Sequence, residues 1–217
     1  MRETGAIAGV SVAHADATVD EIEAAGGDGV RATVSDLLAR EGVEEAFAVQ
    51  TCNRSEAYVV TDRTVDGNTA LSTFAPDVRG GAVRRLDHEE SLEHLMRVAS
   101  GLESLVLGED QIIGQLREAY EESKSAGGIG PVLKDAVTKA LHVGERARTE
   151  TSINEGVVSL GSAAVRLAAG EIDLTDGSAV VVGAGVMGTL AARALDDTPV
   201  SDIVVANRTV PHAEFVA

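Results

Sequence analysis

Short apolar runs and amphipathic stretches interleave along the first sixty residues, a pattern that predicts strands separated by helices. The expected strands are AIAGVSVAH (6–14), EAFAVQ (45–50) and SEAYVVT (55–61). The expected helices, in which apolar residues recur at helical spacing, are ATVDEIEAA (17–25) and RATVSDLLAREGV (31–43). Turn-forming residues predict loops at TVDGNT (64–69) and APDVRGG (75–81).

Helical periodicity dominates the middle of the chain. It runs from Asp87 to about Thr149, with breaks at Gly101, at Gly108 and in the AGGIGP stretch before Val132. Another amphipathic helix, rich in small residues that suit close packing, is expected at 156–172.

Closely spaced glycines follow a buried-looking strand at 179–182, and a second strand, DIVVA, is expected at 202–206. The glycine stretch consists of Gly183, Ala184, Gly185, Val186, Met187 and Gly188. Such glycines permit a tight turn, let backbone N–H groups approach a pyrophosphate and let the next helix pack on the strand. Dinucleotide binding is the favoured interpretation; a tight strand–helix turn without a ligand is the alternative.

The end of the second strand distinguishes the two nicotinamide cofactors. NAD sites place Asp or Glu there, whereas this chain has Asn207 and Arg208, and an arginine can accept the 2′-phosphate of NADP. NADPH is therefore expected, with a solvated turn residue as the alternative for Arg208.

The whole pattern predicts an α/β chain. An α+β domain spans 1–155, and a linker helix with the first part of a Rossmann-type NADP-binding domain spans 156–217.

Composition shows that the chain is strongly acidic. Its 217 residues include 35 Asp and Glu against 18 Lys and Arg, a formal net charge of −17, and the acidic residues are spread along the chain. Such a surface repels itself in dilute buffer, whereas molar salt shortens the Debye length to about 3 Å. A halophile's cytoplasm explains this composition better than a basic ligand does.

The only cysteine, Cys52, lies in a corner between two expected strands, directly before Asn53 and Arg54. Two interpretations remain open: a small buried hydrophobe, or a nucleophile whose thiolate is favoured by the guanidinium. One cysteine cannot form an internal disulfide, and the N-terminus lacks the layout of a signal peptide. No apolar run is long enough to span a bilayer. We expect a cytoplasmic protein.

Polar side chains also gather on two expected helices. His94 falls off the apolar side of the first and could face a polar pocket, although a lone helical histidine is more often a surface or capping residue. Gln111 and Gln115, four residues apart, share one side of the next helix. Glu109 and Asp110 are placed in its first turn, where acids match the helix dipole.

Three motifs, TCNRSEAY (51–58), HLMRVASGLESLVLGEDQIIGQLREAY (94–120) and GAGVMG with NRT, occur in this order. Together they resemble glutamyl-tRNA reductases, which begin the five-carbon route to tetrapyrroles. The resemblance runs from about Ala6 to the last residue. Gln50 and Ser55 stand where many members have Ser and Thr, changes that leave the chemistry intact. Members continue through a complete nucleotide-binding domain and a helical dimerisation domain, so the chain resembles an N-terminal portion.

The resemblance implies that the cysteine matching Cys52 attacks the aminoacyl ester of glutamyl-tRNA to form a thioester, and that hydride from NADPH releases glutamate-1-semialdehyde. It implies that His94 is important for activity, and Arg54 is the natural partner of the substrate's side-chain carboxylate. The implied glutamate pocket consists of Thr51, Cys52, Asn53, Arg54, Ser104, Glu109, Asp110, Gln111 and Gln115. The implied NADPH site is the stretch from Gly183 to Gly188.

Glutamyl-tRNA is the implied partner, and a homodimer is expected for the full-length protein. Docking of glutamate-1-semialdehyde aminomutase is left open, and no metal ion is expected.

Two other functions remain as alternatives. A dinucleotide-binding sensor would bind NADPH without thioester chemistry, and a noncatalytic tRNA-binding module would bind tRNA and ignore NADPH. The sequence shows no basic face of the kind that nucleic-acid binders have.

The acidic composition predicts that the fold depends on high salt. Lowering NaCl from molar concentration to about 0.1 M lengthens the Debye length to about 10 Å, so repulsion among neighbouring acids is no longer screened. The melting temperature, followed by circular dichroism, should rise with NaCl across this range. A melting temperature that is flat or falls with salt would contradict the halophile interpretation.

Overall fold

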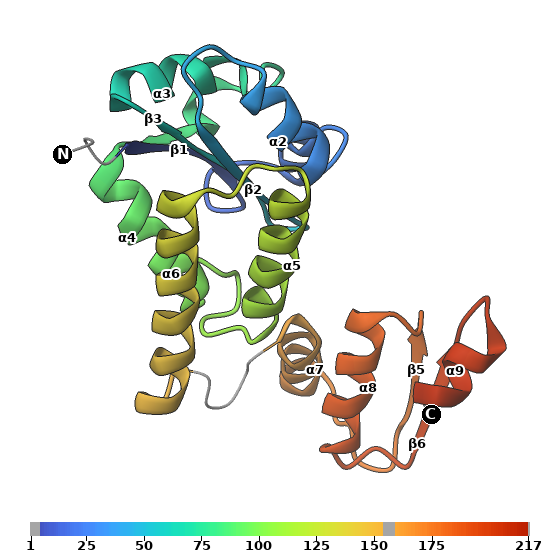
Figure 1. Cartoon of the computed structure of the whole chain (residues 1–217). Coiled ribbons are helices and arrows are strands. Elements are labelled where there is room, and N and C mark those ends of the chain that lie inside the picture. The colour runs from blue at the N-terminus through green and yellow to red at the C-terminus, as the bar shows by residue number, and fades with distance from the viewer. Residues whose placement is uncertain (1–4, 154–158, 217) are drawn as a thin grey trace. The chain divides into compact units, whose positions relative to one another are not determined.

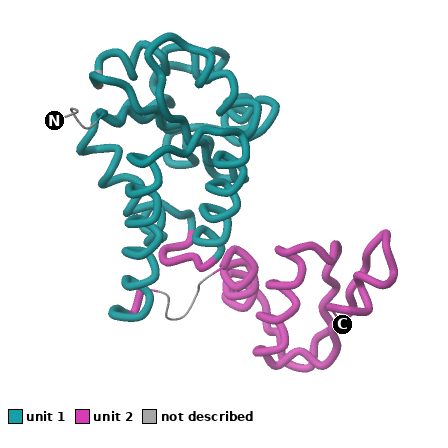
Figure 2. Tube along the Cα trace, in the orientation of Figure 1, with its two compact units in different colours: residues 1–105, 111–151 teal, residues 106–110, 152–217 magenta. Residues whose placement is uncertain are grey.

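The structure is a computed structural model that describes residues 5–153 and 159–216. The chain forms two compact units, one of residues 1–105 and 111–151, the other of residues 106–110 and 152–217 (Figure 2). The predicted domain boundary between residues 155 and 156 lies outside the described residues. Residues 106–110 group with the second unit because Gly108, at a φ of +75°, packs so closely on Ile153 that a Cβ would overlap its carbonyl oxygen.

A four-stranded antiparallel sheet, in the order β2-β3-β1-β4, forms the centre of the first unit. Its strands are β1 (Ala6–Ala13), β2 (Glu45–Thr51), β3 (Arg54–Thr61) and β4 (Arg84–Leu86). The first three confirm the predicted strands. The last was not predicted, because three residues with two exposed arginines carry no alternating apolar pattern.

In the described part of the first unit, α-helices pack around this sheet (Figure 1). They are α1 (Val19–Gly26), α2 (Val30–Leu38), α3 (Thr64–Ala70), α4 (His88–Ala99), α5 (Gln111–Ser125) and α6 (Pro131–Glu150). Single 3₁₀ turns occur at Leu71–Thr73 and Gly80–Ala82. The loop predicted at 64–69 is wrong, because these residues form α3. Gly67 serves close packing there rather than a turn: a Cβ would lie 2.6 Å from the side chain of Ala8.

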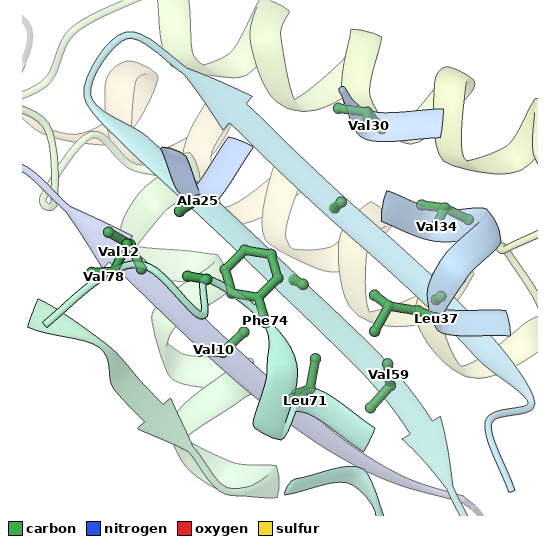
Figure 3. Packing of buried hydrophobic residues seen from close by; sticks show 14 of the residues in the cluster. Val10, Val12, Ala25, Val30, Val34, Leu37, Val59, Leu71, Phe74 and Val78 are labelled. Carbon is green, nitrogen blue, oxygen red and sulfur yellow. The ribbon is translucent and has the colours of Figure 1, made fainter. Parts of the chain in front are cut away.

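Each face of the sheet carries its own apolar core, because successive side chains of a strand point to opposite faces. On one face, Val10 and Val59 pack with residues from α1, α2 and the 71–82 segment, among them Phe74 (Figure 3). On the other, Phe47 and Tyr58 stack with their ring centroids 6.0 Å apart and pack with residues from α4, α5 and α6. Both faces of the sheet are therefore covered.

A buried carboxylate joins the start of β2 to the start of α6. Helix α6 has no side-chain cap at Gly130, and the carboxylate of Glu45 instead accepts hydrogen bonds from the backbone N–H groups of Val132 (3.0 Å) and Leu133 (2.7 Å). Free N–H groups in the first helical turn require such acceptors. This contact anchors the helix on the same face as α4.

The second unit contains a parallel strand pair flanked by helices. Its elements are α7 (Leu160–Glu171), β5 (Ser178–Val182), α8 (Val186–Asp196), β6 (Asp202–Ala206) and α9 (Val210–Val216). The parallel register pairs Val182 with Ala206, so both strands end at the same edge. This confirms the predicted strand–glycine–helix–strand order. Across the described residues, every helix is too short or too polar to traverse a bilayer.

Candidate functional site

Cys52 lies at the tip of the β2–β3 hairpin, whose turn consists of Cys52 and Asn53 between the paired residues Thr51 and Arg54. The Thr51 hydroxyl accepts a hydrogen bond from the Asn53 N–H (3.2 Å), and the Asn53 carbonyl accepts one from the N–H of His14 (3.0 Å). The first bond closes the turn on itself, and the second ties it to the end of β1. The Cys52 side chain is exposed, so the interpretation of Cys52 as a buried hydrophobe is wrong.

Arg54 is buried directly behind this turn, with only 2% of its surface exposed. Its Nη1 forms an ion pair with Glu56 Oε1 at 3.0 Å, and its Nη2 donates to the backbone carbonyl of Glu103. The guanidinium therefore has internal partners. Glu56 was not identified from the sequence, although a glutamate inside an apolar strand, two residues from an arginine and so on the same face, was an available signal.

Glu56 is fully buried, and three side chains besides that of Arg54 hydrogen-bond to its carboxylate. Its Oε1 accepts from the Ser11 hydroxyl at 3.0 Å and lies 2.9 Å from His94 Nε2, while Oε2 accepts from the Tyr58 hydroxyl at 2.8 Å. We call these five residues the Glu56 network. It joins β1, β3 and α4 on the sheet face that α4, α5 and α6 cover.

The network determines the ionisation of its members. Burial alone would raise the pKa of Glu56, but attraction by His94, the hydrogen bond from His94 and the charge of Arg54 together hold that pKa far below its ordinary value. Burial and the adjacent Glu56 charge raise the pKa of Tyr58 well above its usual value. Glu56 is therefore a carboxylate at neutral pH, and Tyr58 a neutral hydrogen-bond donor.

His94 is buried rather than at the surface, with 3% of the residue exposed, so its interpretation as a surface or capping residue is wrong. Helix α4 can approach the sheet because Gly9 has no side chain: a Cβ there would lie 2.9 Å from the Ser91 hydroxyl and from the Tyr58 ring. Because Nε2 faces a carboxylate, we assign a proton to it. His94 Nδ1 has no hydrogen-bond partner among the described residues.

The loop after α4 supports Arg54. The backbone carbonyl of Glu103 accepts a hydrogen bond from Arg54, and the Glu103 carboxylate forms an ion pair with Arg97 at 2.5 Å. Burial raises the pKa of Glu103, but the hydrogen bond from Arg97 and nearby positive charges outweigh it and leave that pKa below its ordinary value. Ser104 is half-buried next to it.

Gln111 and Gln115 are half-buried in the first turns of α5, and the Gln111 amide nitrogen is a second buried polar atom without a partner among the described residues.

Glu109 and Asp110 precede α5 instead of forming its first turn, since the helix begins at Gln111. They belong to the 106–110 segment of the second unit, where Glu109 is buried and Asp110 exposed. That Glu109 and Asp110 belong to the same site as Cys52 stays a prediction.

The glycine stretch after β5 has the backbone that a dinucleotide requires. Gly183 has a φ of +102°, and its N–H donates to the Ala206 carbonyl at 2.7 Å. Gly188 packs so closely that a Cβ would overlap the Gly183 carbonyl oxygen, whereas the space at Gly185, before the first residue of α8, is open. The open space at Gly185 thus lies at the N-terminus of α8, and backbone N–H groups at a helix N-terminus can bind a phosphate group.

Asn207 and Arg208 follow β6, at the edge where the glycine stretch follows β5. The Asn207 side-chain amide donates to the Thr209 carbonyl at 3.1 Å, which fixes the turn, and Arg208 is exposed.

Comparison with known proteins settles the family. Residues 9–151 match the family model described as "Glutamyl-tRNAGlu reductase, N-terminal domain", and residues 166–217 match "Shikimate / quinate 5-dehydrogenase". The chain belongs to the glutamyl-tRNA reductase family. The family model covers Ser11 of β1, the hairpin, α4 and α5, and so all of the Glu56 network and the two glutamines. The second match covers the glycine stretch and supports a dinucleotide cofactor.

Relatives named glutamyl-tRNA reductase include those of Haloarcula marismortui, 61% identical over 99% of this chain and 48% of the relative, and Haloquadratum walsbyi, 59% identical over 99% and 47%. The structure titled "Glutamyl-tRNA Reductase from Methanopyrus kandleri" is 37% identical, with a TM-score of 0.68 over 100% of this chain and 52% of that chain. The chain thus spans about half the length of these members of the glutamyl-tRNA reductase family.

Because the pKa of Glu56 is lowered on folding, the folded protein binds fewer protons than the unfolded chain in acid. The stability that Glu56 contributes is present above the ordinary glutamate value of 4.5 and is lost as the pH falls below it. We expect Glu56→Gln to lower the free energy of unfolding by about 3–5 kcal/mol at pH 7, since Arg54 is left buried without its counter-ion. Below pH 4.5, the free energy of unfolding should fall less in this variant than in the parent.

Urea unfolding in molar salt at several pH values measures this effect. Glu118→Gln, at an exposed position on α5, is the matched control and should follow the parent. If the free energy of unfolding fell equally with pH in the parent and in Glu56→Gln, the lowered pKa of Glu56 would be contradicted.

Proposed function

We propose that this chain carries the acyl-transfer site and part of the cofactor site of an NADPH-dependent glutamyl-tRNA reductase, which converts glutamyl-tRNA to glutamate-1-semialdehyde through a thioester on Cys52. The observation that carries the proposal is the hairpin: an exposed thiol lies at its tip and an arginine is buried directly behind it. Family membership supports the substrate.

The proposed reaction begins with the thiolate of Cys52. Its sulfur attacks the ester carbonyl carbon, the carbon–oxygen bond to the tRNA ribose breaks, and the ribose oxygen leaves with a proton. A thioester is more reactive toward hydride than the ester it replaces. NADPH, when bound at the glycine stretch, would supply that hydride and release the aldehyde, after which the thiol is free again.

The buried residues act on this reaction by holding groups in position. Arg54, which Glu56 and the Glu103 carbonyl hold in place, carries the positive charge that attracts the glutamate side-chain carboxylate. Glu56 accepts from His94 Nε2 and so leaves Nδ1 to meet a substrate group. The Gln111 amide nitrogen is a second buried group that a ligand could satisfy. These unsatisfied atoms support a polar ligand on the α4–α5 side of the hairpin.

NADPH is proposed over NADH because Arg208, and not an acidic residue, follows β6. Homodimerisation, docking of glutamate-1-semialdehyde aminomutase and a cytoplasmic location are proposals that rest on family membership alone.

Covalent labelling tests the nucleophile. Incubation of the chain with radiolabelled glutamyl-tRNA in molar salt should leave label on the protein. Cys52→Ser should abolish this label while the circular dichroism spectrum is unchanged, because Cys52 is exposed. Free radiolabelled glutamate serves as the control for adventitious binding. Substantial labelling of Cys52→Ser would remove Cys52 from the nucleophile role.

Cofactor choice is tested at Arg208 in protein extended to the length of its relatives. Arg208→Ala should weaken NADPH binding about tenfold and leave NADH binding nearly unchanged, since one charge-assisted contact to the 2′-phosphate is lost. Arg193→Ala, exposed on α8, is the matched control. Equal losses for both cofactors would exclude the NADPH assignment.

A further inference from the structure

The outer face of α6 carries a groove lined by basic side chains. The groove has a volume of about 520 Å³, and all the residues that line it belong to α6. Four of them are basic and exposed: Lys134, Lys139, His142 and Arg146. Lys134, His142 and Arg146 are spaced by multiples of four residues, so they share one side of the helix. None of these residues belongs to the Glu56 network or to the implied glutamate pocket.

The charge of this groove is opposite to that of the whole chain. The chain carries 35 acidic residues against 18 Lys and Arg, yet the groove contains two of its three lysines, and Asp135 alone is acidic among the residues that line it. Arg146 pairs with Glu150 at 2.8 Å, whereas Lys134 and Lys139 have no ion-pair partner in the part of the chain that the structure describes. The two ammonium groups can therefore bind an external anion.

Contacts on the opposite side of α6 fix this face in place. Leu133 and Val137 are buried in the core that α6 shares with α4. Gly144 packs so closely on α4 that a Cβ would overlap the Ala99 carbonyl oxygen, and Arg148 donates a hydrogen bond to the same carbonyl at 2.8 Å. Because the helix is held along its length, the groove is presented by a rigid element.

We propose that the outer face of α6 binds the phosphate backbone of the tRNA whose aminoacyl ester Cys52 attacks; this rests on the proposed function. The ester is a small part of such a substrate, so most of the phosphates lie beyond the Cys52 hairpin and need a surface of their own. Helix α6 belongs to the helical layer that covers the Glu56 network, on the side of the sheet to which the acyl part is assigned.

The side chains of the groove suit phosphates. A lysine ammonium is a compact, strongly hydrated point charge that binds phosphate without demanding one geometry. From Lys134 to Arg146 the basic side extends about 18 Å along the helix axis, and a nucleic-acid duplex carries roughly one negative charge per 2 Å of its axis. Several phosphates can therefore lie along this face. Such contacts position a nucleic acid and carry no sequence information.

The sequence alone does not reveal this face. Its basic residues are separated by apolar residues that point into the core, and only the helix brings them to one side. In molar salt each phosphate contact is weak, because little is gained by releasing counterions. We therefore expect α6 to orient the tRNA, while the hairpin selects the ester.

Fluorescence anisotropy with deacylated tRNA for glutamate tests the face without any thiol chemistry. In molar KCl, Lys134→Gln/Lys139→Gln should weaken binding about tenfold, or about threefold for each exposed charge pair lost. The slope of log affinity against log salt should become less steep by about two. Lys134→Arg/Lys139→Arg keeps both charges and should bind as the parent does. Arg31→Gln/Arg63→Gln removes two exposed charges from α2 and the start of α3, over the opposite face of the sheet, and is the matched control.

Covalent labelling separates the face from the reaction. Lys134→Gln/Lys139→Gln should slow the labelling of Cys52 by glutamyl-tRNA, and should leave unchanged its labelling by glutamyl-adenosine, which ends in the same ester but has no phosphate. Loss of tRNA binding in this variant without labelling of any protein supports the face and removes the proposed reaction alone.

Three results would overturn the proposal. They are the absence of tRNA binding by the folded parent, an equal loss of binding in Arg31→Gln/Arg63→Gln, and equal binding by the parent and Lys134→Gln/Lys139→Gln. The last result would assign the groove to an anionic partner other than RNA, such as an acidic protein.

Discussion

A carboxylate with no exposed surface must be neutralised and hydrogen-bonded, and three elements of the first unit, β1, β3 and α4, supply the partners of Glu56 that meet this requirement. The donors come from β1, β3 and α4, so one buried charge holds the hairpin strand, its neighbour and the covering helix together. Removing Arg54 would leave the charge of Glu56 in the core without its ion-pair partner. The geometry behind Cys52 is therefore held by the stability of the fold itself.

This constraint explains why an exposed cysteine can have a defined environment. The turn is short, its carbonyl is bonded to the end of β1, and Arg54 below it cannot move without breaking its contacts to Glu56 and Glu103. Among the described residues, His94 Nδ1 and Gln111 Nε2 on the α4–α5 face are buried nitrogens without hydrogen-bond partners.

Local sequence patterns predicted much of the fold, because strand alternation, helical spacing and the glycine stretch are encoded within a few residues. The strands beside Cys52 and the β5–α8–β6 order belong to this class. Features that depend on distant partners were missed or left open. The turn-like composition of residues 64–69 did not reveal α3, since Gly67 fits against Ala8 of another strand. Glu56 and His94, 38 residues apart, became partners only through packing of α4 on the sheet.

The most direct test of the Glu56 network is a double-mutant cycle of unfolding free energies with Glu56→Gln, His94→Gln and the double variant, measured by urea unfolding in molar salt at pH 7. Residues in one buried hydrogen-bonded network couple by about 0.5–3 kcal/mol. The account predicts that the two losses are strongly non-additive, with a coupling of about 1 kcal/mol or more. Losses that add to within about 0.3 kcal/mol would show that Glu56 and His94 act independently, and would contradict the account.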